Sequence, residues 1–149
     1  MLVKDKANIL THNQWTCGDY LNNVTDFKFI GISSQAISLD NTNPTNGKVC
    51  LKIERTDNNG YSFIIIPYQI TSDDLGKTLT ITAYIKNNIP AGVIALQISG
   101  ATAVRTYIPN ISEGTFTVTR VLESDDLQMQ ITTNGFGEIY LDNIIATFQ

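Results

Sequence analysis

The sequence is poor in charge, and above all in positive charge. Only 16% of its 149 residues are charged, and ten lysines and arginines face fourteen acids, which gives a net charge of −4. Nucleic-acid binding depends on a basic surface that neutralises phosphates, so we expect no nucleic-acid partner. The same shortage of cations argues against binding to anionic membrane surfaces.

Long apolar segments are also missing. No run approaches the roughly 18 residues of a membrane span, so we expect no membrane insertion. Residues 1–7 are polar and contain lysine, and they lack the apolar core of a signal peptide. The chain is then cytosolic, or part of a longer exported protein, or a virion component. We expect an extracellular or virion-surface location, as part of a larger protein or particle.

Cysteine is scarce, and its spacing matches no known motif. Cys17 and Cys50 have neither the paired spacing of a zinc site nor that of a C-x-x-C redox motif. Two separate buried thiols are the favoured interpretation. A disulfide between the two residues is the alternative.

Residues suited to catalysis are few as well. His12 is the only histidine, and no nucleophile lies at a recognisable spacing from it. Asp73-Asp74 and Asp125-Asp126 are neighbours in expected loops, whereas a glycosidase needs two carboxylates that face each other across the scissile bond. We therefore predict that the chain is not an enzyme, and a small hydrolase is the least favoured reading.

What the sequence has in abundance is alternation of apolar and polar residues. In residues 78–86, Leu79, Ile81, Ala83 and Ile85 alternate with polar side chains. Similar runs occupy residues 48–54, 93–99 and 127–132, while residues 61–66 are apolar on both faces and predict a central strand. Weaker strands are expected near residues 27–30, 102–108, 115–122 and 138–148. This period of two predicts sheets with one buried face.

Turn residues separate these runs. Asn-Gly pairs occur at Asn46-Gly47, Asn59-Gly60 and Asn134-Gly135. The last pair lies between two alternating runs and predicts a tight β-hairpin. Residues 72–75 could cap a single helical turn, but no window has sustained helical periodicity. We predict one domain over residues 1–149, an all-β jelly-roll sandwich of two antiparallel sheets.

A family resemblance rests on landmarks spread along the chain. The start Asn8-Ile-Leu-x-x-Asn13-x-Trp15 is similar to Asn-Leu-x-x-Asn-Gly-x-Phe-Glu, and the end Ile139-Tyr-Leu-Asp-Asn-Ile144 to Tyr-Leu-Asp-Asn-Val. Between them, Gly76-Lys-Thr-Leu-Thr-Ile-Thr-Ala-Tyr-Ile-Lys86 resembles Gly-Lys-x-Tyr-x-Leu-Ser-Ala-Trp-Val-Lys. These segments resemble jelly-roll carbohydrate-binding modules of the xylan- and glucan-binding type. The resemblance implies a galactose-binding-like β-sandwich that binds polysaccharide.

The resemblance also implies a structural calcium ion. In the family it is held partly by an aspartate of the last strand, which Asp142 matches, and by a glutamate after the opening aromatic residue. Thr16 stands at that second position, so one carboxylate ligand that calcium prefers is missing. We therefore assign Asp142 as a tentative calcium ligand, with hydrogen bonding to backbone amides as the alternative.

Sugar binding requires aromatic faces and planar polar groups on a rigid surface. The outward positions of the expected strands carry such groups, and we assign a ligand-binding platform to Tyr84, Gln97, Arg105, Tyr107, Gln128 and Gln130. This platform exists only if those strand faces share one sheet. Trp15, Tyr61 and Tyr140 are instead expected to pack in the structure.

The favoured function is that of a non-catalytic carbohydrate-binding module, which attaches a larger protein or particle to a polysaccharide or cell-surface glycan. The alternative is a structural or adhesion module of a phage tail or surface fibre that acts through protein–protein contacts. The low number of charges and the single clear aromatic residue on the polar strand faces also fit this alternative.

Overall fold

The computed structural model describes residues 8–18, 26–32, 36–44, 48–56, 60–100 and 102–149. Residues 1–7, the expected turn at Asn46-Gly47, Asn59 and the side chain of His12 lie outside the described part. Among the described residues, no helix is both long enough and apolar enough to cross a membrane.

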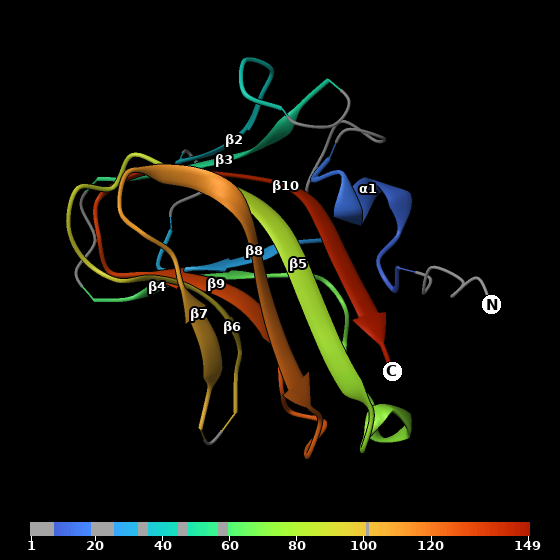
Figure 1. The fold of residues 1–149 in the computed structure, drawn as a ribbon. Coiled ribbons are helices and arrows are strands. Elements are labelled where there is room, and N and C mark those ends of the chain that lie inside the picture. The colour runs from blue at the N-terminus through green and yellow to red at the C-terminus, as the bar shows by residue number, and fades with distance from the viewer. Residues whose placement is uncertain (1–7, 19–25, 33–35, 45–47, 57–59, 101) are drawn as a thin grey trace.

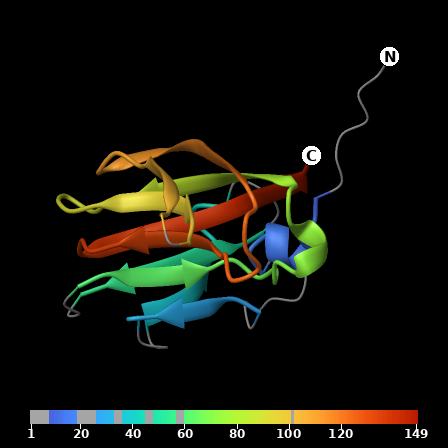
Figure 2. The ribbon, with the colours of Figure 1, turned by 90° about the horizontal axis from the view of Figure 1, so that it is seen from below.

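The described strands form two antiparallel sheets that face each other (Figures 1 and 2). Sheet A has the order β1 (Lys28–Ile30), β4 (Ser62–Ile65), β9 (Met129–Thr133), β6 (Ile94–Ile98), β7 (Val104–Tyr107). Sheet B has the order β2 (Ile37–Asp40), β3 (Cys50–Arg55), β10 (Gly137–Phe148), β5 (Thr78–Asn87), β8 (Ser112–Val121). The prediction of an all-β sandwich is confirmed.

Two short helices lie at the end of the sandwich where the chain ends (Figure 2). They are α1 (His12–Trp15) and the 3-10 helix η2 (Ser72–Asp74). The single turn expected at residues 72–75 is therefore present, and Asp74 caps it by accepting a hydrogen bond from the backbone N–H of Thr71 at 2.9 Å. The sequence pattern did not predict α1.

The core lies between the sheets and follows the alternation of the strands. Leu79, Ile81, Ala83 and Ile85 of β5 are all fully buried, as predicted, and they pack in one cluster with Leu51 and Ile53 of β3. Each large aliphatic side chain buried in this way contributes about 1.5–3 kcal/mol to folding. The opposite face of β5 is polar and half-exposed.

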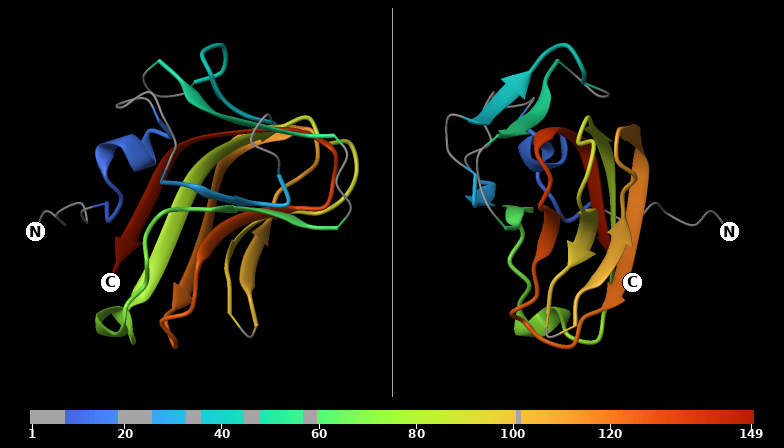
Figure 3. Two further views of the ribbon diagram at one scale, coloured as in Figure 1. Left: turned by 180° about the vertical axis from the view of Figure 1, so that it is seen from behind. Right: turned by 90° about the vertical axis from the view of Figure 1, so that its left-hand side faces the viewer.

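The expected tight hairpin at Asn134-Gly135 is wrong. β9 belongs to sheet A and β10 to sheet B, so this turn carries the chain from one sheet to the other (Figure 3, left). The glycine is needed for close packing, since a Cβ atom on Gly135 would come within 2.4 Å of the carbonyl oxygen of Ala91. Asn134 secures the turn by accepting a 2.7 Å hydrogen bond from the backbone N–H of Val93.

Candidate functional site

The outer face of sheet A carries the candidate site, and strand register decides which side chains meet there. Phe63 of β4 is paired with Thr132 of β9, Thr132 with Ala95 of β6, and Ala95 with Tyr107 of β7. Each antiparallel step is about 4.8 Å, so the two aromatic residues stand roughly 14 Å apart across the sheet. Small residues lie between them, which hollows the surface.

The neighbouring row on the same face is polar. Register aligns Gln130 of β9, Gln97 of β6 and Arg105 of β7. Nε of Arg105 donates to Oε1 of Gln97 at 3.2 Å, and Nε2 of Gln97 donates to Oε1 of Gln130 at 2.8 Å. Nε2 of Gln130 then donates to Oε1 of Gln128 at 3.0 Å. We call this chain of hydrogen bonds the amide ladder.

Together the two rows form a groove of about 320 Å³. Its lining residues are Tyr61, Phe63, Val93, Gln97, Arg105, Tyr107 and Thr132. Two tyrosine rings stand out from it, because Tyr107 is 63% exposed and Tyr61 is 50% exposed. A shallow groove with exposed rings and a few oriented polar groups is suited to a flat ligand that has both C–H faces and hydroxyl groups.

The structure therefore brings five of the six predicted platform residues to one sheet face. Gln97, Arg105 and Tyr107 line the groove itself. The other two glutamines continue the amide ladder towards a second hollow of about 490 Å³, which Gln128 lines. Gln97 and Gln130 are 4% and 8% exposed, and their amides bond to each other. Their role in this structure is to hold Arg105 in place.

Tyr84 does not share this face, which corrects the predicted platform. It lies on β5 in sheet B, between Asp142 of β10 and Thr115 of β8. Its hydroxyl donates a 2.6 Å hydrogen bond to Oε2 of Glu113. Burial and this hydrogen bond raise the pKa of Tyr84 to about 12. Alternation correctly turned Tyr84 outward but could not say on which sheet.

The other aromatic residues divide between packing and the site. Tyr140 is 9% exposed and packs as predicted, with the ammonium groups of Lys52 and Lys86 each 5.9 Å from its ring centre. Trp15 is half-buried against the core, in agreement with a packing role. The packing role expected for Tyr61 is wrong, because its ring lines the groove. Phe63 was missed as a site residue, since its strand is apolar on both faces.

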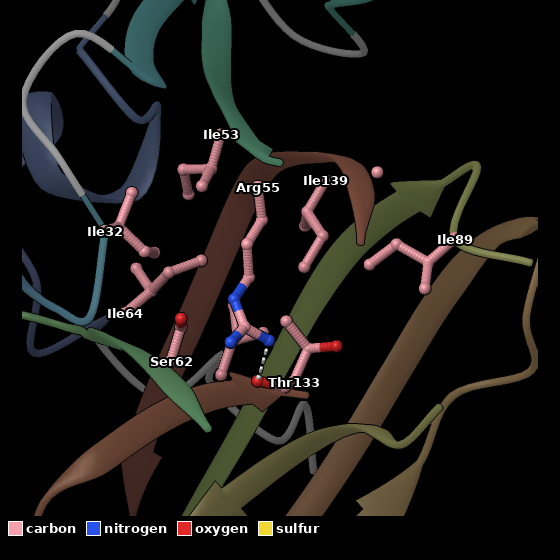
Figure 4. Close-up of a pocket in the computed structure, with 10 residues that line it drawn as sticks. Ile32, Ile53, Arg55, Ser62, Ile64, Ile89, Thr133 and Ile139 are labelled. Atoms are coloured by element: carbon pink, nitrogen blue, oxygen red, sulfur yellow. Dashed lines mark hydrogen bonds between the residues drawn. The ribbon is translucent and has the colours of Figure 1, made fainter. Parts of the chain in front are cut away.

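Two of the three arginines have structural roles. Arg55 is 4% exposed and enters a small cavity of about 10 Å³ lined largely by isoleucines (Figure 4). Its guanidinium donates to the carbonyl oxygens of Thr133 and Gly135, which ties β3 to the turn between the sheets. A cavity of that size holds about one water molecule, so it is not a ligand site. Arg120 likewise donates to the carbonyl oxygens of Ser99 and Thr102 in the β6–β7 connection.

Asp142, the expected calcium ligand, lies in a buried cluster with two thiols. Its side chain is fully buried, and Oδ1 accepts a 2.8 Å hydrogen bond from the backbone N–H of Asn143. The free thiols of Cys17 and Cys50 are its neighbours, and calcium prefers oxygen ligands to sulfur. Within the described ranges, no group of three or more His, Cys, Asp or Glu side chains could hold a metal ion. A buried carboxylate beside two thiols suits the alternative role of Asp142, hydrogen bonding to backbone amides, better than calcium coordination.

Both cysteines are free and buried, as favoured from the sequence. Burial raises the pKa of Cys17 well above its ordinary value, and the nearby carboxylate of Asp142 adds to the shift. Burial likewise raises the pKa of Cys50 to about 12, with Asp40 the next cause. Its thiol lies 3.9 Å from Oδ2 of Asp40. Both thiols are therefore protonated and unreactive at neutral pH.

The two acidic pairs are not arranged for catalysis. Asp74 is buried and holds the η2 turn, where it also accepts a hydrogen bond from the hydroxyl of Tyr68 at 3.2 Å. Asp125 and Asp126 are exposed at the rim of the second hollow. This pair therefore lies in an exposed loop, as expected, whereas Asp74 of the other pair is buried.

The β-sandwich of this chain is similar in fold to solved carbohydrate-binding modules, as the resemblance implied. One solved structure with this fold is TmCBM61 in complex with β-1,4-galactotriose, at 10% identity and a TM-score of 0.67. The alignment covers 96% of this chain and 99% of that module. A second is the CBM22-1 xylan-binding domain of Paenibacillus barcinonensis Xyn10C, at 10% identity, a TM-score of 0.57, and coverage of 82% and 85%.

A third similar structure belongs to a phage protein. It is the enzymatically active domain of tailspike protein 4 from bacteriophage CBA120, at 12% identity and a TM-score of 0.65. The alignment covers 95% of this chain but only 21% of the tailspike chain. No family model and no curated protein sequence matches this chain. At such low identities, the structural likeness establishes the fold and leaves the ligand open.

Proposed function

We propose that this domain binds carbohydrate without catalysis, through the groove on the outer face of sheet A. The observation that carries the proposal is the pairing of two exposed tyrosine rings with an arginine held by buried glutamines. Aromatic rings offer an apolar face to the C–H side of a sugar ring, and a guanidinium group donates hydrogen bonds to its oxygens. The solved module in complex with galactotriose and the solved xylan-binding domain support this reading through their shared fold.

In the wider protein or particle, the domain serves for attachment to a polysaccharide or cell-surface glycan. The likeness to a segment of a phage tailspike supports a place in such an assembly. It equally favours the second candidate, a structural module that acts through protein–protein contacts. The two candidates differ in whether the isolated chain binds glycans.

The test is a glycan-array screen followed by calorimetric titration of the best ligand. Tyr107→Ala removes the most exposed ring of the groove, and we expect at least a tenfold loss of affinity with an unchanged melting temperature. Tyr84→Ala is the matched control, because the same truncation is made on the opposite sheet. Binding should survive in that control.

The proposal fails if no glycan binds, or if Tyr107→Ala and Tyr84→Ala bind equally well. A monomeric chain with glycan affinity supports the attachment role. Self-assembly into a trimer without any glycan affinity would instead favour the structural module.

A further inference from the structure

The charge of the groove differs in sign from the charge of the whole chain. The net charge is −4, yet among the described residues that line the groove Arg105 is the only charged one. No described residue forms a salt bridge with Arg105. As far as the described lining goes, the groove therefore carries one positive charge and no carboxylate.

The orientation of Arg105 leaves its donors available to a ligand. Of its three nitrogens, Nε is the one that bonds to Gln97, at 3.2 Å. Within the described part of the chain, no residue accepts a hydrogen bond from its two Nη groups. The guanidinium is therefore held through one edge, while its outer nitrogens face solvent in the groove. By contrast, Nη groups of Arg55 and Arg120 donate hydrogen bonds to backbone carbonyl oxygens.

We propose that the groove recognises an acidic polysaccharide, with a uronic acid carboxylate bound by the Nη groups of Arg105 beside the ring of Tyr107. This inference rests on the proposed carbohydrate binding. A planar guanidinium donates two parallel hydrogen bonds to a carboxylate, and this bidentate pairing of opposite charges is stronger and more specific than single bonds to neutral hydroxyl groups. The amide ladder contributes by holding the guanidinium before the ligand arrives, which lowers the entropy lost on binding.

The charge pattern further restricts the class of ligand to polysaccharides with widely spaced carboxylates. Among the described residues, one cation lines the groove, while the neighbouring hollow has three acids, Asp26, Asp125 and Asp126, against one cation, Lys28. A polymer with a carboxylate on every sugar would place further negative charge near these acids. A repeat that carries one uronic acid among neutral sugars avoids that repulsion.

The test compares acidic polysaccharides with their carboxyl-reduced forms, in which each uronic acid has become a neutral sugar. The probes are glucuronoxylan and gellan with spaced acids, polygalacturonate with dense acids, and neutral galactan. We expect glucuronoxylan or gellan to bind best, and carboxyl reduction to weaken binding about tenfold or more. Binding of the acidic form should also weaken as salt is added.

Variants then assign the effect to one side chain. Arg105→Gln should weaken binding of the acidic form much more than binding of the reduced form, so that the variant binds the two forms about equally. Arg105→Lys, which keeps the charge but loses the planar fork, should fall between. Lys77→Gln is the control for net charge, because Lys77 lies beside η2 and away from the groove.

The possible results separate the two proposals. Equal binding of acidic, reduced and neutral polysaccharides would overturn the acidic ligand and leave carbohydrate binding intact. The acidic ligand would also be overturned if Arg105→Gln and Lys77→Gln lowered the affinity for the acidic polysaccharide equally. A preference for polygalacturonate would overturn the inference that the ligand carries widely spaced carboxylates. If none of these polysaccharides nor any arrayed glycan binds, the proposed function itself is refuted.

Discussion

Replacing Gln97 by leucine tests the amide ladder, on which the geometry of the groove depends. Gln97 is 4% exposed and makes two side-chain hydrogen bonds, one to Gln130 and one from Arg105. Leucine fills a similar volume but can make neither bond. The change leaves Oε1 of Gln130, which is 8% exposed, without its present donor.

The magnitude follows from the polar group left behind. A buried acceptor without a partner costs about 1–3 kcal/mol, and we expect a loss near the middle of that range. For a domain of this size, 1 kcal/mol corresponds to about 2–4 °C, so the melting temperature should fall by roughly 4–8 °C. Affinity for the ligand should fall as well, because Arg105 loses the bond that orients it.

The assay is urea unfolding and thermal melting of Gln97→Leu beside Gln128→Leu. Gln128 stands at the exposed end of the same ladder, so its replacement should change the free energy of unfolding by less than about 0.5 kcal/mol. If both variants have the same melting temperature as the wild type, the amide ladder does not stabilise the groove. If Gln97→Leu loses stability but keeps its affinity for the ligand, the amide ladder stabilises the fold without orienting Arg105 for binding.

Three further predictions concern the opposite sheet and its buried cluster. Chelation with EDTA, or addition of calcium, should leave the melting temperature unchanged, because Asp142 lies among thiols; an upward shift with calcium would contradict this. Cys17 and Cys50 should resist a thiol reagent in the native protein and react fully in urea, and rapid native labelling would show that they are accessible. The pKa of Tyr84 is raised from 10.0 to about 12, so its stabilising contribution is complete below pH 10 and is lost as the pH rises towards 12. Tyr84→Phe should remove that part of the alkaline destabilisation in urea titrations, and an identical pH profile for the two proteins would refute the shift.

Alternation in the sequence was sufficient to predict the faces of the strands. The inward set of β5 and the outward amides of β6 and β9 lie where a period of two places them, because side-chain direction is a local property of an extended chain. β2 was not predicted. It is only four residues long, and its pairing with β3 stabilises it. The helix α1 was missed for a similar reason, since four residues carry no periodic signal.

By itself, the sequence determined the all-β class, the buried aliphatic core and the two-faced strands. Only the tertiary structure decided which strands are neighbours. It separated Tyr84 from the amide ladder, placed Tyr61 and Phe63 in the groove, and turned the expected hairpin at Asn134-Gly135 into a crossing between sheets. Strand pairing joins segments far apart in the chain, such as Phe63 with Thr132, and no local pattern encodes that choice.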